Sequence, residues 1–193
     1  MTNPFRTHDV IVQSDIWTWA DGVLSRLMSD SPPAYRLLGA ATGCLAVVTT
    51  MLLARRTLGT PSALAGGAIV ATMPIQLWAS RSSMANILDP LVLTTALWLT
   101  DRLLETRDRR DAIACGIALG LGYYGYFGAR AFPLVVAVSL TPLLLRRPFG
   151  SGIANYARLG LWTLAGFLVT TAPMLAYAAD DPTQFFERVN QVT

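Results

Sequence analysis

The sequence predicts an all-α, polytopic membrane protein: a bundle of about six transmembrane helices plus one amphipathic helix on the external surface. The composition, the long uncharged stretches and the positions of the arginines lead to this fold class. Hydrophobic residues make up 53% of the 193 residues, charged residues only 14%, and the mean hydropathy is +0.44. A soluble domain carries roughly 25% charged residues and a disordered chain is highly charged, so the composition argues against both.

The apolar residues gather in six stretches that are uncharged or carry charge only near their ends. These stretches are residues 37–54, 61–80, 87–104, 112–129, 131–145 and 159–179. A bilayer core needs about 20 helical residues, with roughly 17–25 workable, so we expect all but one to span it. The stretch 131–145 is shorter; it spans with Arg130 and Arg146 reaching outward, or it is a partial span.

Residues 1–36 precede the first stretch and are predicted to form an external loop. Residues 12–29 of this loop are expected to form an amphipathic helix, because apolar residues recur there at helical spacing. The recurring residues are Val12, Ile16, Trp19, Val23 and Leu27. Trp17 and Trp19 suit a water–lipid interface, and Pro32-Pro33 ends the segment. An ordinary amphipathic connector explains the same pattern.

The distribution of charged residues predicts which side of the membrane each loop occupies. All 15 basic residues are arginines, and they punctuate the apolar stretches instead of forming one basic face, which argues against a nucleic-acid partner. Loops on one side of the bundle hold nine arginines and four acids, whereas the other side holds six arginines and eight acids. The positive-inside rule then places both ends of the chain outside, together with the segments around 81–89 and 127–131.

An external start needs an earlier segment to carry it across the membrane, and residues 1–36 contain no secretory signal. We therefore expect the chain to be a piece of a longer protein with at least one helix upstream. Residues 37–179 form the transmembrane bundle in this interpretation. Residues 180–193 begin a further external loop.

The sequence around Asp89 is the best candidate for chemistry. Asp89 precedes Pro90 and an apolar stretch, which is typical of a helix N-cap followed by proline at the first helical position. A carboxylate at the mouth of a membrane cavity is the other interpretation, and a capping Asp can also face a site. Arg81 lies eight residues earlier and could pair with Asp89 or bind a phosphate.

A Gly- and Tyr-rich stretch leads to a second candidate, Arg130. Gly116 and Gly120 form a small-xxx-small pair that permits close helix packing. Tyrosines at positions 123, 124 and 126 are expected near the external interface as anchors. Arg130 is either an interfacial arginine reaching toward water or a phosphate ligand.

Other reactive residue types carry weaker signals. His8, the only histidine, lies near Asp9 and Asp15, but a solvated loop histidine explains it better than a metal site. Cys44 and Cys115 lie inside apolar stretches without metal-ligand spacing and are expected to be small buried hydrophobes. No residue is assigned as a metal ligand.

The order of the motifs resembles the lipid-carrier-dependent glycosyltransferases of the GT-C superfamily. The resemblance is nearest to bacterial proteins related to protein O-mannosyltransferases and to the aminoarabinose transferase of lipid A. It includes Asn-Ile-Leu-Asp-Pro-Leu at 86–91 and Ala-Arg-Ala-Phe-Pro at 129–133. The other matching segments are residues 34–38, 52–59, 73–74, 80–81, 116–126 and 181–189.

The resemblance implies a multi-pass enzyme of the bacterial plasma membrane that transfers a sugar from a polyprenyl-phosphate donor. The acceptor, a glycan, lipid or protein, would be reached on the external or periplasmic face. Asp89 would be a catalytic-site acid, and Arg81 and Arg130 would bind the lipid phosphate. In the family the catalytic base is an acid in the first external loop, directly after the first span, and that segment would fall upstream of Met1; Asp9 and Asp15 would lie in the later half of the loop and are not equated with the base. Developing charge on the leaving phosphate calls for arginine or a divalent metal.

Two alternatives from other classes stay open at this point. A transporter module is disfavoured because no convincing repeat is visible and the apolar stretches are nearly free of charge. A non-catalytic membrane assembly subunit is the other alternative.

Overall fold

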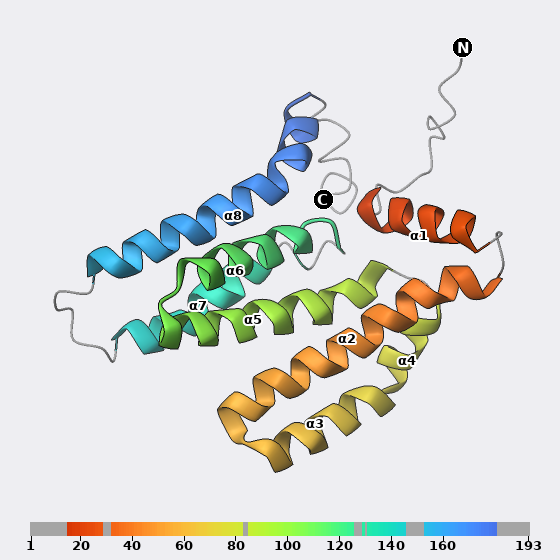
Figure 1. Cartoon of the computed structure of the whole chain (residues 1–193), viewed down its shortest axis with the longest axis horizontal. Helices are drawn as coiled ribbons and strands as arrows, with labels where there is room; N and C mark the ends of the chain where they lie inside the picture. Colours follow the sequence, from red (N-terminus) through yellow and green to blue (C-terminus); the bar gives the residue numbers. More distant parts are fainter. Residues whose placement is uncertain are drawn as a thin grey trace, which may run out of the picture.

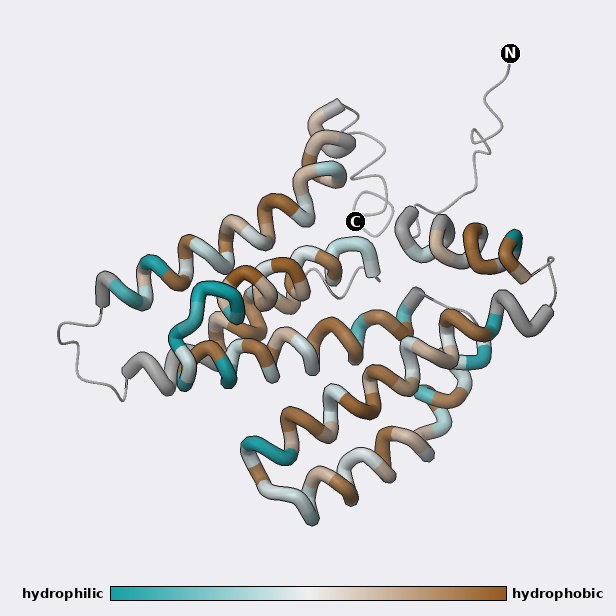
Figure 2. Tube along the Cα trace, viewed as in Figure 1, coloured by the Kyte–Doolittle hydropathy of each residue, from teal (hydrophilic) through white to brown (hydrophobic). Residues whose placement is uncertain are grey.

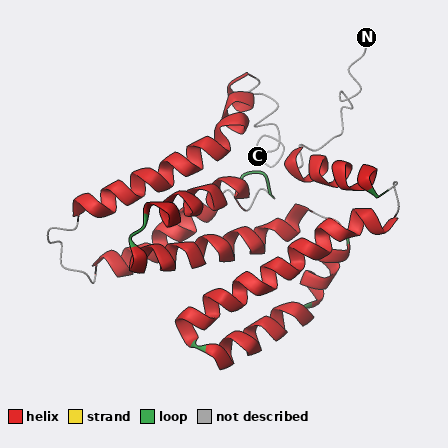
Figure 3. Cartoon of the chain, viewed as in Figure 1, coloured by secondary structure: helices red, strands yellow, loops and turns green. Residues whose placement is uncertain are grey.

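The computed structural model describes residues 15–28, 32–82, 85–125, 129, 131–145 and 153–180. Within these residues the structure is helical and contains no β-strand, as Figure 3 shows. The all-α prediction is therefore confirmed. The elements are α1 (Asp15–Leu27), α2 (Pro32–Leu58), α3 (Thr60–Thr72), α4 (Pro74–Arg81), the short 3₁₀ helix η1 (Ala85–Ile87), α5 (Leu88–Thr106), α6 (Arg109–Gly122), α7 (Phe132–Leu145) and α8 (Ile153–Asp180) (Figure 1).

Among the residues that the structure describes, two helices are long and apolar enough to cross a membrane. They are the segment Arg36–Leu58 of α2 and the segment Asn155–Ala176 of α8, and both overlap expected spans. Prolines suit the first turn of α2, and Arg55 and Arg56 in its last turn complement the helix dipole. The stretches 37–54 and 159–179 are therefore confirmed as helices of transmembrane length.

The expected span over 61–80 is instead a bent pair of helices. Helices α3 and α4 meet at Met73 with a bend of 57°, and together they satisfy the length and hydropathy of a third span. Pro74 begins α4 because proline lacks the N–H that an unbroken helix would use. The expected span over 61–80 is therefore interrupted by a bend at Met73, while the helices on both sides of the bend together keep the hydropathy of a span.

The remaining expected spans are short or carry charge. Helix α5 has 19 residues but contains charged residues near both ends. Helices α6 and α7 have 14 residues each, below the roughly 20 that a straight crossing needs. The stretch 112–129 was expected to be helical throughout, but α6 ends at Gly122 and the chain turns at 123–125. Glycine favours helices poorly, which accounts for the early end.

The helices run alternately between two ends of the bundle. Helices α2 and α5 lie side by side, joined by the hydroxyls of Thr49 and Thr94 at 2.7 Å and by Arg56 Nε and Asp101 Oδ2 at 2.6 Å. Helix α6 returns beside α5, and α8 lies against α6 (Figure 1). Two of the arginine-rich loops, the α2–α3 and α5–α6 connections, thus share one end, and Figure 2 shows them as hydrophilic segments.

The closest helix contact is between α6 and α8, and glycines make it possible. A Cβ atom on Gly116 would overlap the carbonyl oxygen of Thr163. One on Gly120 would lie 2.7 Å from Thr170 Cβ, and one on Gly166 would lie 2.5 Å from the carbonyl oxygen of Ile113. The predicted small-xxx-small packing is therefore confirmed.

Burial corrects two expectations. Cys115 is buried, as expected, and its Sγ lies 3.3 Å from Thr100 Oγ1. Cys44 is instead exposed on α2.

Helix α1 confirms the helical prediction for the segment before the first apolar stretch. Trp17 of this helix is only 7% exposed because it packs on Ala79 and Ile87. Trp17 therefore anchors α1 to the bundle and does not lie at a lipid interface. The side chain of Trp19 lies outside the described residues.

Candidate functional site

The candidate site lies at the end of the bundle where α4 ends, α5 begins and α6 ends. Ile87 of η1 is 1% exposed and packs with Trp17 of α1 and Ala79 of α4. Leu38 of α2 and Leu88 of α5 complete this apolar cluster. Five elements (α1, α2, α4, η1 and α5) are thus packed together at the start of α5. This packing fixes the positions of the polar residues there.

Asp89 lies in the first turn of α5 and is half-buried. The N-cap position is Ile87, and no side chain caps the helix. The prediction that Asp89 is the N-cap is therefore wrong, because η1 runs directly into α5 and moves the helix start ahead of Asp89. A carboxylate in the first turn is still favoured by the helix dipole. The side chain of Asp89 therefore has no capping role.

The carboxylate of Asp89 faces the turn that follows α6. A Cβ atom on Gly125 would lie 2.8 Å from Asp89 Oδ1, so the absence of a side chain at 125 makes room for the carboxylate. The amide of Gly125 donates to the carbonyl of Gly122 at 3.0 Å and closes the turn. Residues 36 positions apart in the sequence, Asp89 and Gly125, therefore meet at one point of the structure.

Asn86 was not singled out from the sequence, and the structure adds it to the site. Its Oδ1 atom is buried and has no hydrogen-bond donor among the described residues. A buried acceptor without a partner costs about 1–3 kcal/mol, so it is unusual unless a ligand or an ordered water supplies the donor. The signal for Asn86 in the sequence is its spacing of three residues from Asp89.

Of the two arginines proposed from the sequence, the structure describes one. Arg81 is the last residue of α4, and its side chain is exposed on the same end of the bundle as Asp89. Arg130 lies outside the described residues. Its neighbour Ala129 is fully buried, and a Cβ atom on Gly125 would lie 3.8 Å from Ala129 Cβ. The chain next to position 130 therefore lies beside the turn that faces Asp89.

The tyrosines after α6 hold that turn against α8. Tyr124 Oη donates to the carbonyl oxygen of Thr170 at 2.9 Å. The rings of Tyr123 and Phe167 meet edge to face, with centroids 5.3 Å apart and planes at 80°. Tyr123 and Tyr124 are half-buried and make these contacts within the bundle. Tyr126 lies outside the described residues.

The described residues contain no group of three or more His, Cys, Asp or Glu side chains that could hold a metal ion. His8 and Asp9 lie outside the described residues, as does the side chain of Asp15. What the site offers is a half-buried carboxylate, a buried acceptor oxygen and an exposed guanidinium. The two acceptors suit sugar hydroxyls, and a guanidinium suits phosphate.

Comparison with known proteins gives one result. The family model described as dolichyl-phosphate-mannose-protein mannosyltransferase matches residues 16–177. No curated protein and no solved structure gives a significant match. The matched range includes all of the described candidate site, from Trp17 to Ala129.

Proposed function

We propose a function from the premise that this chain belongs to the dolichyl-phosphate-mannose-protein mannosyltransferase family. Family membership makes it part of a membrane glycosyltransferase. The proposal is that this enzyme transfers a sugar from a polyprenyl-phosphate donor to a glycan, lipid or protein acceptor on the external or periplasmic face. The observation that carries it is the half-buried Asp89 carboxylate facing the Gly125 turn, inside the matched range.

The reaction joins an acceptor oxygen to the anomeric carbon of the sugar as the bond from that carbon to the phosphate oxygen breaks. The acceptor hydroxyl loses its proton, for which a positioned carboxylate is suited. Asp89 is proposed to take part by accepting this proton or by holding the reacting sugar hydroxyls. Asn86 Oδ1 is proposed to accept a hydrogen bond from the sugar, which would satisfy its buried oxygen.

The leaving group is the lipid phosphate, on which negative charge develops. Arg81 and Arg130 are proposed to stabilise that charge, because a guanidinium forms two parallel hydrogen bonds with phosphate. The exposed position of Arg81 beside η1 supports this role. A divalent metal is the other source of such charge, and chelation tests it.

The membrane arrangement proposed is six spans in the plasma membrane of a bacterium, with the Asp89 end external. Two spans by length and a third as a bent pair support part of this count. The gathering of arginines at the end opposite Asp89 supports the orientation, because arginine-rich short loops stay on the cytoplasmic side. The family match favours this enzyme over a transporter or an assembly subunit.

The test measures sugar transfer from a radiolabelled polyprenyl-phosphate sugar in membranes of cells that express the gene. Asp89→Asn removes the charge and keeps the size. We expect transfer to fall by about 100-fold or more, the usual contribution of a general base. Asp108→Asn is the matched control, because Asp108 is an exposed acid at the opposite end of the bundle.

Near wild-type transfer in Asp89→Asn, at equal membrane insertion, would remove Asp89 from the mechanism. No transfer by the wild-type protein with any polyprenyl-phosphate sugar would overturn the proposed donor. Loss of transfer on adding a chelator, restored by a divalent ion, would assign the leaving-group charge to a metal instead of the arginines.

A further inference from the structure

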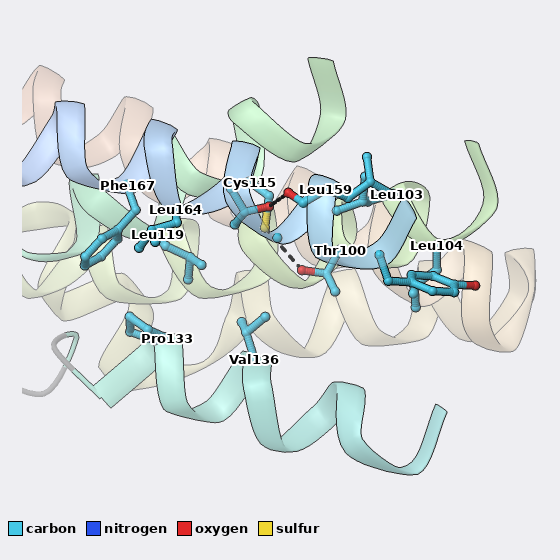
Figure 4. Close-up of a pocket in the computed structure, with 13 residues that line it drawn as sticks. Thr100, Leu103, Leu104, Cys115, Leu119, Pro133, Val136, Leu159, Leu164 and Phe167 are labelled. Atoms are coloured by element: carbon cyan, nitrogen blue, oxygen red, sulfur yellow. Dashed lines mark hydrogen bonds between the residues drawn. The ribbon is translucent and has the colours of Figure 1, made fainter. Parts of the chain in front are cut away.

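A cavity of about 390 Å³ lies between α5, α6, α7 and α8. Pro133 and Val136 of α7 form one wall, and Leu119, Leu164 and Phe167 lie across from them, as Figure 4 shows. Two of its few polar groups, the hydroxyls of Thr100 and Thr163, already contact Cys115 Sγ and the carbonyl oxygen of Leu159. The volume is within the ~300–1,000 Å³ typical of small-molecule pockets, and the lining suits hydrocarbon.

The cavity reaches the arginine-rich end of the bundle through Tyr156. Arg107 Nη2 donates to Tyr156 Oη at 3.2 Å, and its guanidinium lies 5.3 Å from the centre of the Tyr156 ring. Next to this pair, the guanidinium of Arg109 lies 3.5 Å from the centre of the Trp162 ring. Arg107 is therefore held over the ring of Tyr156, which lines the cavity, and Arg109, two residues further on, is held over the ring of Trp162.

The acidic side chains at the arginine-rich end of the bundle interact with groups other than the side chains of Arg107 and Arg109. Asp101 and Glu105 both pair with Arg56, and Asp111 pairs with Arg102 at 3.0 Å. The carboxylate of Asp108 accepts from the backbone amide of Arg110 at 3.0 Å. Arg107 and Arg109 thus keep their positive charge facing outward beside the cavity, which is the charge pattern that complements an anionic headgroup.

We propose that this cavity holds an acyl chain of an anionic phospholipid whose phosphate lies against Arg107 and Arg109. The site is separate from the Asp89 site. Eighteen residues of α5 separate Asp89 from Arg107, about 27 Å at 1.5 Å per residue. A polyprenyl-phosphate donor with its phosphate at Arg107 could not react at Asp89, so the occupant is a structural lipid.

Gly160 allows a direct test, because it lines the cavity and has no atom near the position of a Cβ. Gly160→Leu adds a side chain at the wall of the cavity, and its Cβ atom has no atom within 4 Å. Gly66→Leu is the matched control: it also has open space, but it lies on α3 away from the cavity. The protein is purified in detergent and stripped of lipid. Native mass spectrometry then counts bound phosphatidylglycerol or phosphatidylcholine with identical acyl chains.

We expect the wild-type protein and Gly66→Leu each to bind one phosphatidylglycerol, and Gly160→Leu to bind none. Phosphatidylcholine should bind at least tenfold more weakly. The double variant Arg107→Gln/Arg109→Gln should lower the affinity for phosphatidylglycerol about 30-fold. The control Arg26→Gln/Arg55→Gln, which removes the same charge from exposed arginines elsewhere, should not.

Three results would overturn the proposal: retention of phosphatidylglycerol by Gly160→Leu, equal binding of the two lipids, or an unchanged affinity in the Arg107/Arg109 variant. Displacement of phosphatidylglycerol from the wild-type cavity by polyprenyl phosphate at a lower concentration would also overturn it, because the occupant would then be a lipid carrier. The readout is binding, so it does not depend on the glycosyltransferase activity.

Discussion

The Oδ1 atom of Asp89 occupies the space beside Gly125 into which a Cβ atom would project, 2.8 Å from it. A methyl group at 125 would push the carboxylate out of this space, and a displacement of 1 Å costs a reacting group about 100-fold in rate. Gly125→Ala should therefore lower sugar transfer about 100-fold if Asp89 acts in the reaction. The assay is transfer from the radiolabelled lipid-linked donor.

The fold should tolerate Gly125→Ala. The displaced atom is the end of a flexible side chain, and Gly125 has no positive φ. The other close atom is the Gly122 carbonyl oxygen, 3.2 Å from the new Cβ, so the thermal midpoint in detergent should fall by only a few degrees. Gly66→Ala, in open space on α3, is the control. Full activity in Gly125→Ala would show that the position of the carboxylate does not matter.

Asn86→Leu separates a ligand-binding role from a structural one. The substitution removes a buried oxygen without a partner, so the free energy of unfolding should stay constant or rise by about 1 kcal/mol. If the oxygen binds the donor sugar, the KM for the donor should rise about tenfold or more, whereas Asn86→Asp should retain part of the binding. An unchanged KM in the stable Leu variant would exclude Asn86 from the site.

Helices with a strong local signal could be predicted from the sequence. The uncharged stretches at 37–54 and 159–179 have enough length and hydropathy to specify α2 and α8. The break at Met73-Pro74 was missed because hydropathy does not change there, although proline itself marks a helix start. Two of the arginine-rich loops, α2–α3 and α5–α6, lie at one end of the described bundle, as their charge predicts, because charge is excluded from a membrane whatever the tertiary packing.

The site could be predicted only in part. Asp89 was found because an acid next to an apolar stretch is costly, but its place within the first turn depends on η1, for which the local sequence has no clear signal. The contact between Asp89 and Gly125, and the buried oxygen of Asn86, arise from packing between elements distant in sequence. A single sequence contains no information on such contacts beyond residue type.

The α6–α8 contact predicts opposite effects for two glycines. Gly116→Ala places a methyl group against the Thr163 carbonyl, and backbone cannot move aside as a side chain can. The substitution should lower the free energy of unfolding by about 3 kcal/mol. Gly66→Ala meets open space in α3 and should raise it by up to about 1 kcal/mol through helix propensity.

Unfolding in mixed detergent micelles, followed by circular dichroism, compares the two variants directly. Equal stability of Gly116→Ala and Gly66→Ala would contradict the close approach of α6 and α8. Intermediate loss of stability in Gly120→Ala is expected as well, because the atom it meets belongs to the side chain of Thr170.

Asp111 and Glu105 are acids at the same end of the bundle, and their environments predict unequal effects on stability. The side chain of Asp111 is 8% exposed and accepts from Arg102 Nε at 3.0 Å and Thr106 Oγ1 at 2.8 Å. Asp111→Ala leaves both donors without their acceptor, but Arg102 is 45% exposed and can be hydrated. We expect a loss of about 2 kcal/mol in the free energy of unfolding.

Glu105 is 68% exposed and shares Arg56 with Asp101, so Glu105→Ala should cost less than about 1 kcal/mol. High salt should remove most of that smaller effect and leave the Asp111 effect nearly unchanged, because buried groups are screened less. Unfolding of both variants at low and high NaCl measures the difference. Equal losses that vanish together in salt would mean that the Asp111 contacts are as exposed to solvent as those of Glu105.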